Sequence, residues 1–195
     1  MNLPPVRPVV LHTERLTLRR LVPADAEALF TVFSDTEVMR YWSTAPWTDV
    51  DRARQSIESD MQADHLRLAI ERVDRPGLIG TCTLFAFNLP SRRAELGYAL
   101  ARAHWGHGYM HEALSTFVEY AFTTLSLNRL EADIDPRNDG SRRSLERLGF
   151  KKEGHLRERW IVSGEVSDSG LYGLLRADWA AAGSSLRTPS REEKP

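Results

Sequence analysis

Apolar residues recur along this chain at two spacings, and each spacing predicts a different kind of element. Alternation at every second residue predicts a strand, because successive side chains of a strand point to opposite faces. The strands expected from this pattern and from the turns beside them are Leu16–Arg19, Leu66–Arg72, Leu78–Ala86, Arg93–Leu100, Arg129–Asp135, Gly154–Val162 and Val166–Leu175. Turn-forming residues at Asp74–Gly77 and Ser163–Glu165 predict two hairpins.

The other spacing, i, i+3, i+4, predicts helices with one apolar face. It runs through Ala113, Leu114, Phe117, Val118, Ala121 and Phe122. Further helices are expected over Pro23–Phe33, from the capping-box-like Thr48–Asp51 to about Asp64, within residues 141–149, and as a short piece over Ala177–Ala182. The order of elements predicts a mixed α/β (α+β) fold with a central sheet of about seven strands and about four main helices.

Composition adds bounds to this picture. A chain of 195 residues, 42% of them hydrophobic, is expected to form a single domain with a substantial core, and a net charge of −1 argues against nucleic acid as the main partner. The one cysteine, Cys82, excludes an intrachain disulfide, suits a reducing cytoplasm and is expected to be buried in its strand. No membrane span or signal peptide is visible, so we expect a cytoplasmic protein without a membrane partner. Polar residues dominate positions 183–195, which predicts a disordered tail after a domain over residues 11–182.

Two glycines, Gly106 and Gly108, come directly before the long helix and shortly after the strand Arg93–Leu100. A helix N-terminus carries unpaired N–H groups and partial positive charge, and glycine lets an anion approach the backbone closely. The loop is neither a Walker loop, which needs Gly-Lys-Ser/Thr, nor the dinucleotide fingerprint, because position 111 is His rather than Gly. A phosphate-bearing ligand and a simple tight turn are both consistent with the loop alone.

A second motif favours the ligand. The strand Arg129–Asp135 is followed by Asn138 and Ser141, then by a short helix that ends at Gly149. Together, Trp105-Gly-x-Gly-Tyr before Glu112-Ala113-Leu114 and Asn138-x-x-Ser141 before Leu148-Gly149-Phe150 resemble motifs A and B of the GNAT N-acetyltransferase superfamily. The segments Thr13–Arg19 and Tyr172–Trp179 resemble the RimJ/RimL branch, which acetylates ribosomal-protein N-termini. The resemblance covers about Leu11 to Ala182, although motif A usually has Gln, Arg or Glu where this chain has Ala103.

The resemblance implies a GNAT acyl-CoA N-acyltransferase fold, with acetyl-CoA as co-substrate. In this fold the strand that ends near Leu100 splays from the strand Arg129–Asp135, and the pantetheine arm lies in the gap. The residues that it implies for cofactor binding are the backbone of Tyr98, Ala99 and Leu100, the loop residues Gly106, His107, Gly108, Tyr109 and Met110, and the side chains of Asn138 and Arg143. For Arg143, a solvated surface position is an equal alternative.

Acetyl transfer to an amine needs a neutral amine, a polarised carbonyl and a proton for the departing thiolate. Glu95 is the candidate base, because many members of the superfamily carry a glutamate on the strand before the glycine loop; the alternative is a surface glutamate beside Arg92 or Arg93. Ser141 is the candidate proton donor to sulfur, with helix capping as its alternative or additional role. Tyr172 is the reserve acid, unless it packs as a core aromatic residue.

The acceptor stays open at this point. The branch resemblance implies the N-terminal α-amine of a ribosomal protein, but a polyamine, an amino acid or an aminoglycoside fits equally well, and a non-catalytic acyl-CoA-binding module is a further alternative. Trp42 and Trp47, in an aromatic segment, are candidates to line the acceptor pocket or to pack in the core. His107 and His111 lack a third ligand, so no metal is expected. A homodimer would be usual for the resembled branch.

Overall fold

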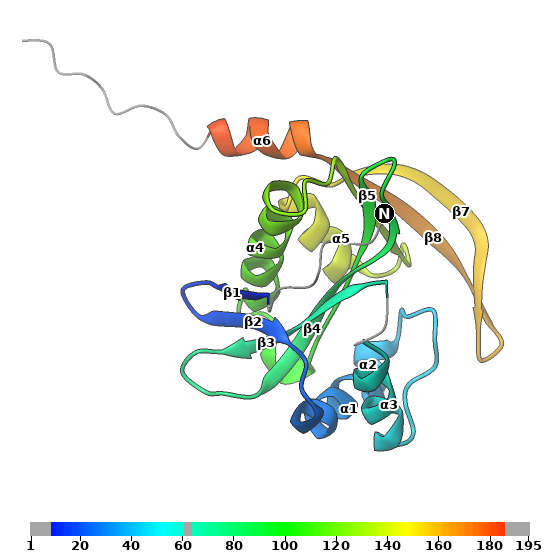
Figure 1. Cartoon of the computed structure of the whole chain (residues 1–195). Coiled ribbons are helices and arrows are strands. Elements are labelled where there is room, and N and C mark those ends of the chain that lie inside the picture. The colour runs from blue at the N-terminus through cyan, green and yellow to red at the C-terminus, as the bar shows by residue number, and fades with distance from the viewer. Residues whose placement is uncertain (1–8, 61–63, 186–195) are drawn as a thin grey trace, which may run out of the picture.

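A computed structural model describes residues 9–60 and 64–185 of the chain, which form one mixed eight-stranded sheet (Figure 1). The strands follow the spatial order β1-β2-β3-β4-β5-β6-β8-β7. Their bounds are β1 Val10–His12, β2 Leu16–Arg20, β3 Leu66–Arg72, β4 Leu78–Asn88, β5 Arg93–Leu100, β6 Arg129–Ile134, β7 Lys151–Val162 and β8 Glu165–Leu175. Neighbouring strands pair antiparallel except β5 and β6, which pair parallel.

Helices cover both faces of the sheet (Figure 1). The α-helices are α1 Ala26–Ser34, α2 Thr36–Met39, α3 Val50–Asp60, α4 Tyr109–Thr123, α5 Asp139–Arg147 and α6 Arg176–Ser185. α1, α2 and α3 pack on one face, whereas α4 and α5 pack on the other. The expected helix and strand positions are therefore confirmed in outline, and the GNAT-type mixed sheet is confirmed as the fold class.

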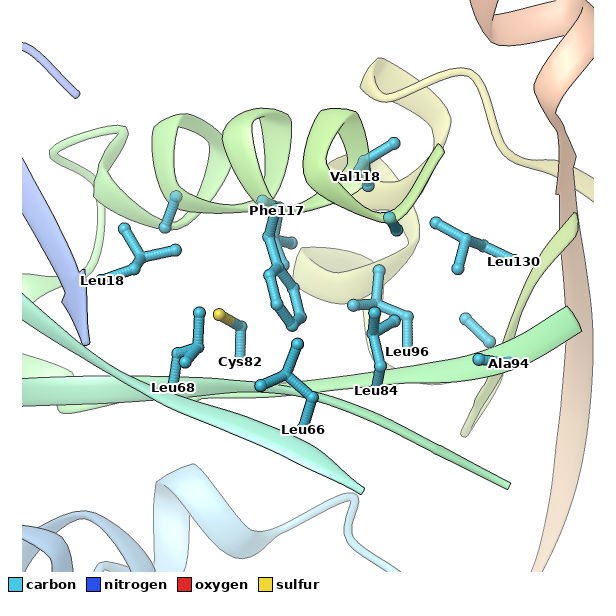
Figure 2. Close-up of a cluster of buried hydrophobic side chains, with 14 of the residues drawn as sticks. Leu18, Leu66, Leu68, Cys82, Leu84, Ala94, Leu96, Phe117, Val118 and Leu130 are labelled. Atoms are coloured by element: carbon cyan, nitrogen blue, oxygen red, sulfur yellow. The ribbon is translucent and has the colours of Figure 1, made fainter. Parts of the chain in front are cut away.

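The larger core lies between the sheet and α4. Phe117 of α4 is fully buried and points toward Leu66, Leu84 and Leu96 of the sheet (Figure 2). Cys82 lies in the same cluster with no exposed surface, and burial raises the pKa of its thiol, so it is a packing residue, as the sequence predicts. Alternate residues of β5 serve the two cores: Ala94, Leu96 and Leu100 join the α4 core, whereas Ala99 joins the smaller core under α1–α3.

The sheet splits between its two parallel strands. β5 pairs with β6 only from Arg93 to Glu95, opposite Arg129 to Glu131. Beyond Glu95, β5 continues to Leu100 and pairs with β4 alone, while β6 continues to Ile134 and pairs with β8 alone. The backbone of β5 from Leu96 onward therefore faces a gap rather than a neighbouring strand, as the family resemblance predicts.

The structure adds two elements that the apolar pattern does not predict, the short strand β1 and the four-residue helix α2. Both are too short to show a period of their own. At the other end, α6 runs to Ser185, three residues into the segment expected to be a tail, and residues 186–195 lie outside the described part. Within the described residues, no helix is long and apolar enough to cross a membrane.

Candidate active site

The glycine loop has a backbone that other residues adopt only with strain. Gly106 and Gly108 have φ of 77° and 80°, in the left-handed region. The indole N–H of Trp105 donates to the carbonyl oxygen of Leu100 at 2.7 Å, which ties the loop to the end of β5. The loop is therefore a fixed turn that delivers the chain from the gap into α4.

The N-terminus of α4 carries no side-chain cap. Gly108 is its N-cap residue and makes no side-chain hydrogen bond, so the first N–H groups of α4 are available to an anion. Glu112, in the first turn, accepts hydrogen bonds from Thr13 Oγ1, from Arg15 N at 2.9 Å and from Arg15 Nε at 2.7 Å. Arg15 also donates to the carbonyl oxygen of His107 at 3.1 Å, so the turn between β1 and β2 holds the glycine loop from outside.

Tyr109 is the centre of a cationic and aromatic surface beside this loop. Its ring stacks on His107 with centroids 5.7 Å apart, and the guanidinium carbons of Arg15 and Arg72 lie 4.7 Å and 5.5 Å from its centroid. Both guanidinium groups are also ion-paired, Arg15 with Glu112 and Arg72 with Asp74, so they pack on the ring beside the N-terminus of α4. The loop residues named from the sequence thus lie together, and Arg15, from the β1–β2 turn, and Arg72, at the end of β3, are additions that come from distant parts of the chain.

Glu95 lies where the pairing of β5 and β6 ends, on the sheet face that carries α1–α3. Its side chain is half-buried, and its pKa is raised above the ordinary value by loss of solvent and then by the like charges of Glu131 and Asp133. Arg93 forms its ion pair with Glu131, not with Glu95. A carboxylate with a raised pKa at the mouth of a gap is chemically suited to act as a base.

Ser141 and Tyr98 join the two sides of the gap on the opposite sheet face. The hydroxyl oxygens of Tyr98, on β5, and Ser141, on α5, are 2.7 Å apart. Burial raises the pKa of Tyr98 to about 12, so it remains a phenol and can donate to Ser141 at neutral pH. Sequence reasoning assigned only the backbone of Tyr98 and missed this contact, because residue spacing does not show which strand residue a later helix will meet.

The cap of α5 is Asn138 rather than Ser141. The side-chain oxygen of Asn138 accepts from the backbone N–H of Ser141 at 3.0 Å, which removes capping as the role of the Ser141 hydroxyl. Arg143 is exposed on α5. Tyr172 is 4% exposed and packs in the α4 core, on the face opposite Glu95. The three candidates for catalysis are thus divided between the two faces, with the gap between them.

A pocket of about 360 Å³ opens over β3, β4 and β5 on the face of Glu95. Trp42 and Trp47 both line it, and Phe33 of α1 holds them, with ring centroids 5.2 Å and 4.7 Å away. The remaining lining comes from Thr44, Arg52, His65, Arg67, Thr81, Thr83, Phe85 and Gly97. Glu95 pairs across the sheet with Phe85, so the pocket lies beside the candidate base.

Arg137, which sequence reasoning passed over, closes one side of this region. It donates to Asp135 at the end of β6 and to Glu165 of the β7–β8 hairpin, and its guanidinium carbon lies 5.8 Å from the ring of Tyr41. The aromatic segment and the hairpin tip are therefore joined through one side chain. In the described residues no group of three or more His, Cys, Asp or Glu side chains is placed to hold a metal ion.

A split mixed sheet with an uncapped helix N-terminus at one end of the gap, and a carboxylate and a pocket at the other, is the architecture of an acyl-CoA-dependent transferase. The chain belongs to the GNAT acetyltransferases: the model of the acetyltransferase (GNAT) domain matches residues 15–151. It is 39% identical over 176 residues to the uncharacterised N-acetyltransferase p20 of Bacillus licheniformis, covering 87% of this chain and 98% of the relative. The protein is thus an acetyl-CoA-dependent N-acetyltransferase.

Two further relatives differ in their acceptors. The ribosomal protein uS5 alanine N-acetyltransferase of Escherichia coli is 28% identical over 191 residues, covering 91% of this chain and 95% of the relative. The crystal structure of the spermidine N-acetyltransferase of Vibrio cholerae, in complex with CoA and spermine, superimposes with a TM-score of 0.78 at 25% identity, over 86% of this chain and 99% of that one. The family is therefore defined, and the acceptor is not.

Proposed function

We propose that this enzyme transfers the acetyl group of acetyl-CoA to the N-terminal α-amine of a protein, of the ribosomal kind, by direct attack in a ternary complex. The observation that carries this proposal is the place of Glu95, a half-buried carboxylate between the gap and the aromatic pocket. The motifs that resemble the RimJ/RimL branch and the relative that acetylates ribosomal protein uS5 support the acceptor class.

In this proposal the co-substrate lies along the gap. The N–H groups of Gly106 through Met110 bind the pyrophosphate at the N-terminus of α4, and the free backbone edge at Tyr98–Leu100 binds the pantetheine amides as an added strand would. The amide N–H₂ of Asn138 reaches the same arm, since its oxygen is taken by Ser141. Arg143, exposed on α5, contacts the 3′-phosphate.

The chemistry follows from which groups face the gap. Glu95 removes a proton from the acceptor amine, directly or through one water, and the amine nitrogen attacks the thioester carbon. A backbone N–H of β5 stabilises the oxyanion, and the C–S bond breaks as the C–N bond is kept. Ser141 donates its proton to the departing thiolate and is reprotonated, through solvent, by the proton that the attacking nitrogen loses as the amide forms, while Tyr98 keeps its hydrogen bond to Ser141. Tyr172, which packs in the α4 core, is the reserve donor.

A single carboxylate matches an α-amine better than a lysine. The ordinary pKa values are about 7.8 and about 10.4, so neutralising a lysine at pH 7 costs about 3.5 kcal/mol more. The spermidine N-acetyltransferase neighbour keeps a polyamine acceptor as the second candidate. A polyamine carries positive charge along its whole length, whereas a protein N-terminus does not, so the two acceptor classes can be distinguished by experiment.

The test is thiol release from acetyl-CoA with two acceptor panels. One panel holds short peptides with free Ala, Ser, Thr or Met N-termini, and the other holds spermidine, amino acids and an aminoglycoside. An added acetyl mass on the peptide α-amine is the expected result. Release with small amines alone would refute the protein acceptor but keep the enzyme class, whereas CoA binding without release in either panel would favour the acyl-CoA-binding module.

A further inference from the structure

The charged side chains that line the aromatic pocket are both arginines, Arg52 of α3 and Arg67 of β3. His65 lies beside β3 in the same lining, and no carboxylate is among the lining residues. Phe85 and Gly97 form the wall nearest Glu95, which lies two residues from Gly97 on the same sheet face. An acceptor whose amine meets Glu95 therefore places the rest of its structure among aromatic rings and guanidinium groups.

Apart from Glu95, three acidic residues of this region, Asp60, Asp35 and Asp51, are committed to other contacts. Asp60 accepts from Arg67 Nε at 2.8 Å and lies 2.6 Å from His65 Nε2, so it holds both side chains in place and offsets part of the charge of Arg67. Asp35 caps α2 and lies 3.4 Å from Arg102. Asp51 forms an ion pair with Arg54, on the part of α3 that does not line the pocket.

Arg52 differs from Arg67 in having no carboxylate partner among the described residues. Its guanidinium carbon lies 5.7 Å from the ring centroid of Trp47, so the aromatic wall positions its charge without neutralising it. A guanidinium in this state is a ready donor to a carboxylate, and such charge-assisted bonds are the stronger ones in proteins.

We propose that the pocket selects an amine acceptor that also carries a carboxylate, and that Arg52 is the residue that binds this carboxylate. In a protein N-terminus the carboxylate is an acidic side chain in the first residues, and in a free amino acid it is the α-carboxylate. This inference rests on the proposed function for the position of the amine. It disfavours a polyamine, whose remaining ammonium groups would face Arg52 and Arg67.

The test measures acceptor binding and acetyl transfer separately. Calorimetry on the protein saturated with CoA compares three amidated hexapeptides that begin Ala-Glu, Ala-Gln and Ala-Lys, together with free glutamate and spermidine. The Ala-Glu peptide is expected to bind about tenfold more tightly than Ala-Gln, and Ala-Lys more weakly still. The preference is expected to shrink with added salt, because Arg52 is exposed.

Arg52→Gln is the diagnostic variant and Arg54→Gln is its matched control. Both residues are exposed on α3, but only Arg52 lines the pocket. Arg52→Gln is expected to abolish the preference for Ala-Glu without changing CoA affinity, and Arg54→Gln to retain it. Equal binding of the three peptides, tighter binding of spermidine, or no acceptor binding at millimolar concentration would each overturn the inference.

The outcomes also separate this inference from the proposed function. Tight binding of acidic peptides without an acetyl mass on the α-amine would refute the protein N-terminus as acceptor but leave the charge selectivity standing. Acetylation of all three peptides with the same kcat/KM and Kd would support the protein N-terminus as acceptor and refute the charge selectivity. If free glutamate binds as tightly as the Ala-Glu peptide, the acceptor is a free amino acid, and the rest of the peptide contributes nothing to binding.

Discussion

The two ends of the active site are built in different ways. The proposed cofactor end is centred on the backbone of one continuous segment, from the end of β5 through Gly106 and Gly108 into α4. The acceptor end is made of side chains from α1, the aromatic segment, α3 and three strands. In the proposed function, the co-substrate common to the family meets the first kind of surface, and the acceptor that distinguishes members meets the second. Substitution of side chains therefore changes the acceptor without dismantling cofactor binding.

The largest effect is expected at the boundary of the two ends. Glu95→Gln removes the proposed base and is expected to lower kcat about 100-fold while the Kd values of both substrates stay near those of the parent. Steady-state kinetics with calorimetry checks both. A comparable loss in Glu131→Gln, on the same sheet face, would show that the charge of the cluster matters rather than the base.

The pH dependence of kcat/KM tests the role of Glu95 further. Because burial and the nearby carboxylates raise the pKa of Glu95, the acid limb of kcat/KM is expected above the range of an ordinary glutamate. The base works when deprotonated, so activity falls as pH drops through this raised pKa. If the acid limb of the kcat/KM profile is unchanged in Glu95→Gln, that limb reports the ionisation of the acceptor amine instead.

The next effect is confined to the cofactor end. Gly108→Val places a β-branched residue at φ of 80°, where left-handed backbone costs about 1–2 kcal/mol, and is expected to weaken CoA binding at least about tenfold. Gly164→Val imposes similar strain at φ of 86° in the distant β7–β8 turn. Equal loss of CoA affinity in both would mean general destabilisation, not a local change of the loop.

A smaller effect is expected across the gap. Tyr98→Phe removes the hydrogen bond to Ser141, which is worth about 1 kcal/mol, so kcat is expected to fall about fivefold with unchanged Kd values. Tyr120→Phe removes a hydroxyl from the far part of α4 and is expected to have no effect. If Ser141→Ala and the double variant show the same loss as Tyr98→Phe, the two hydroxyls act as a unit.

The smallest effect is expected at the rim of the acceptor end. Arg137→Gln removes the link between Asp135 and Glu165 of the β7–β8 hairpin and is expected to raise the acceptor KM about threefold without affecting CoA, because the Arg137–Glu165 pair is exposed and such pairs are worth less than about 1 kcal/mol. Arg142→Gln, whose partners Asp139 and Glu146 lie with it on α5, is the control. A rise in the CoA KM would contradict the separation of the two ends.

The difference between the ends also decides what the sequence could predict. Strand alternation placed the strands of the sheet, and the glycine spacing placed the loop before α4, because both depend on neighbours in the chain. Sequence reasoning did not predict the roles of Arg52 and Arg137 or the Tyr98–Ser141 contact, because each depends on segments that are far apart in sequence. The acidic residues Asp35 and Asp51, which flank the aromatic segment in sequence, lie beside arginines rather than in the pocket.

The contact of Thr13 and Arg15 with Glu112 has a consequence for how this enzyme can be shortened or fused. These partners are 97 and 99 residues apart in the chain, so the turn before α4 is finished by the turn between β1 and β2. A truncation past residue 15 keeps every residue of the gap and the pocket, yet it releases the glycine loop from its outer support. Such a protein would retain its fold-defining motifs but bind the nucleotide part of CoA weakly. The N-terminal turn is therefore a structural requirement that a motif search does not detect.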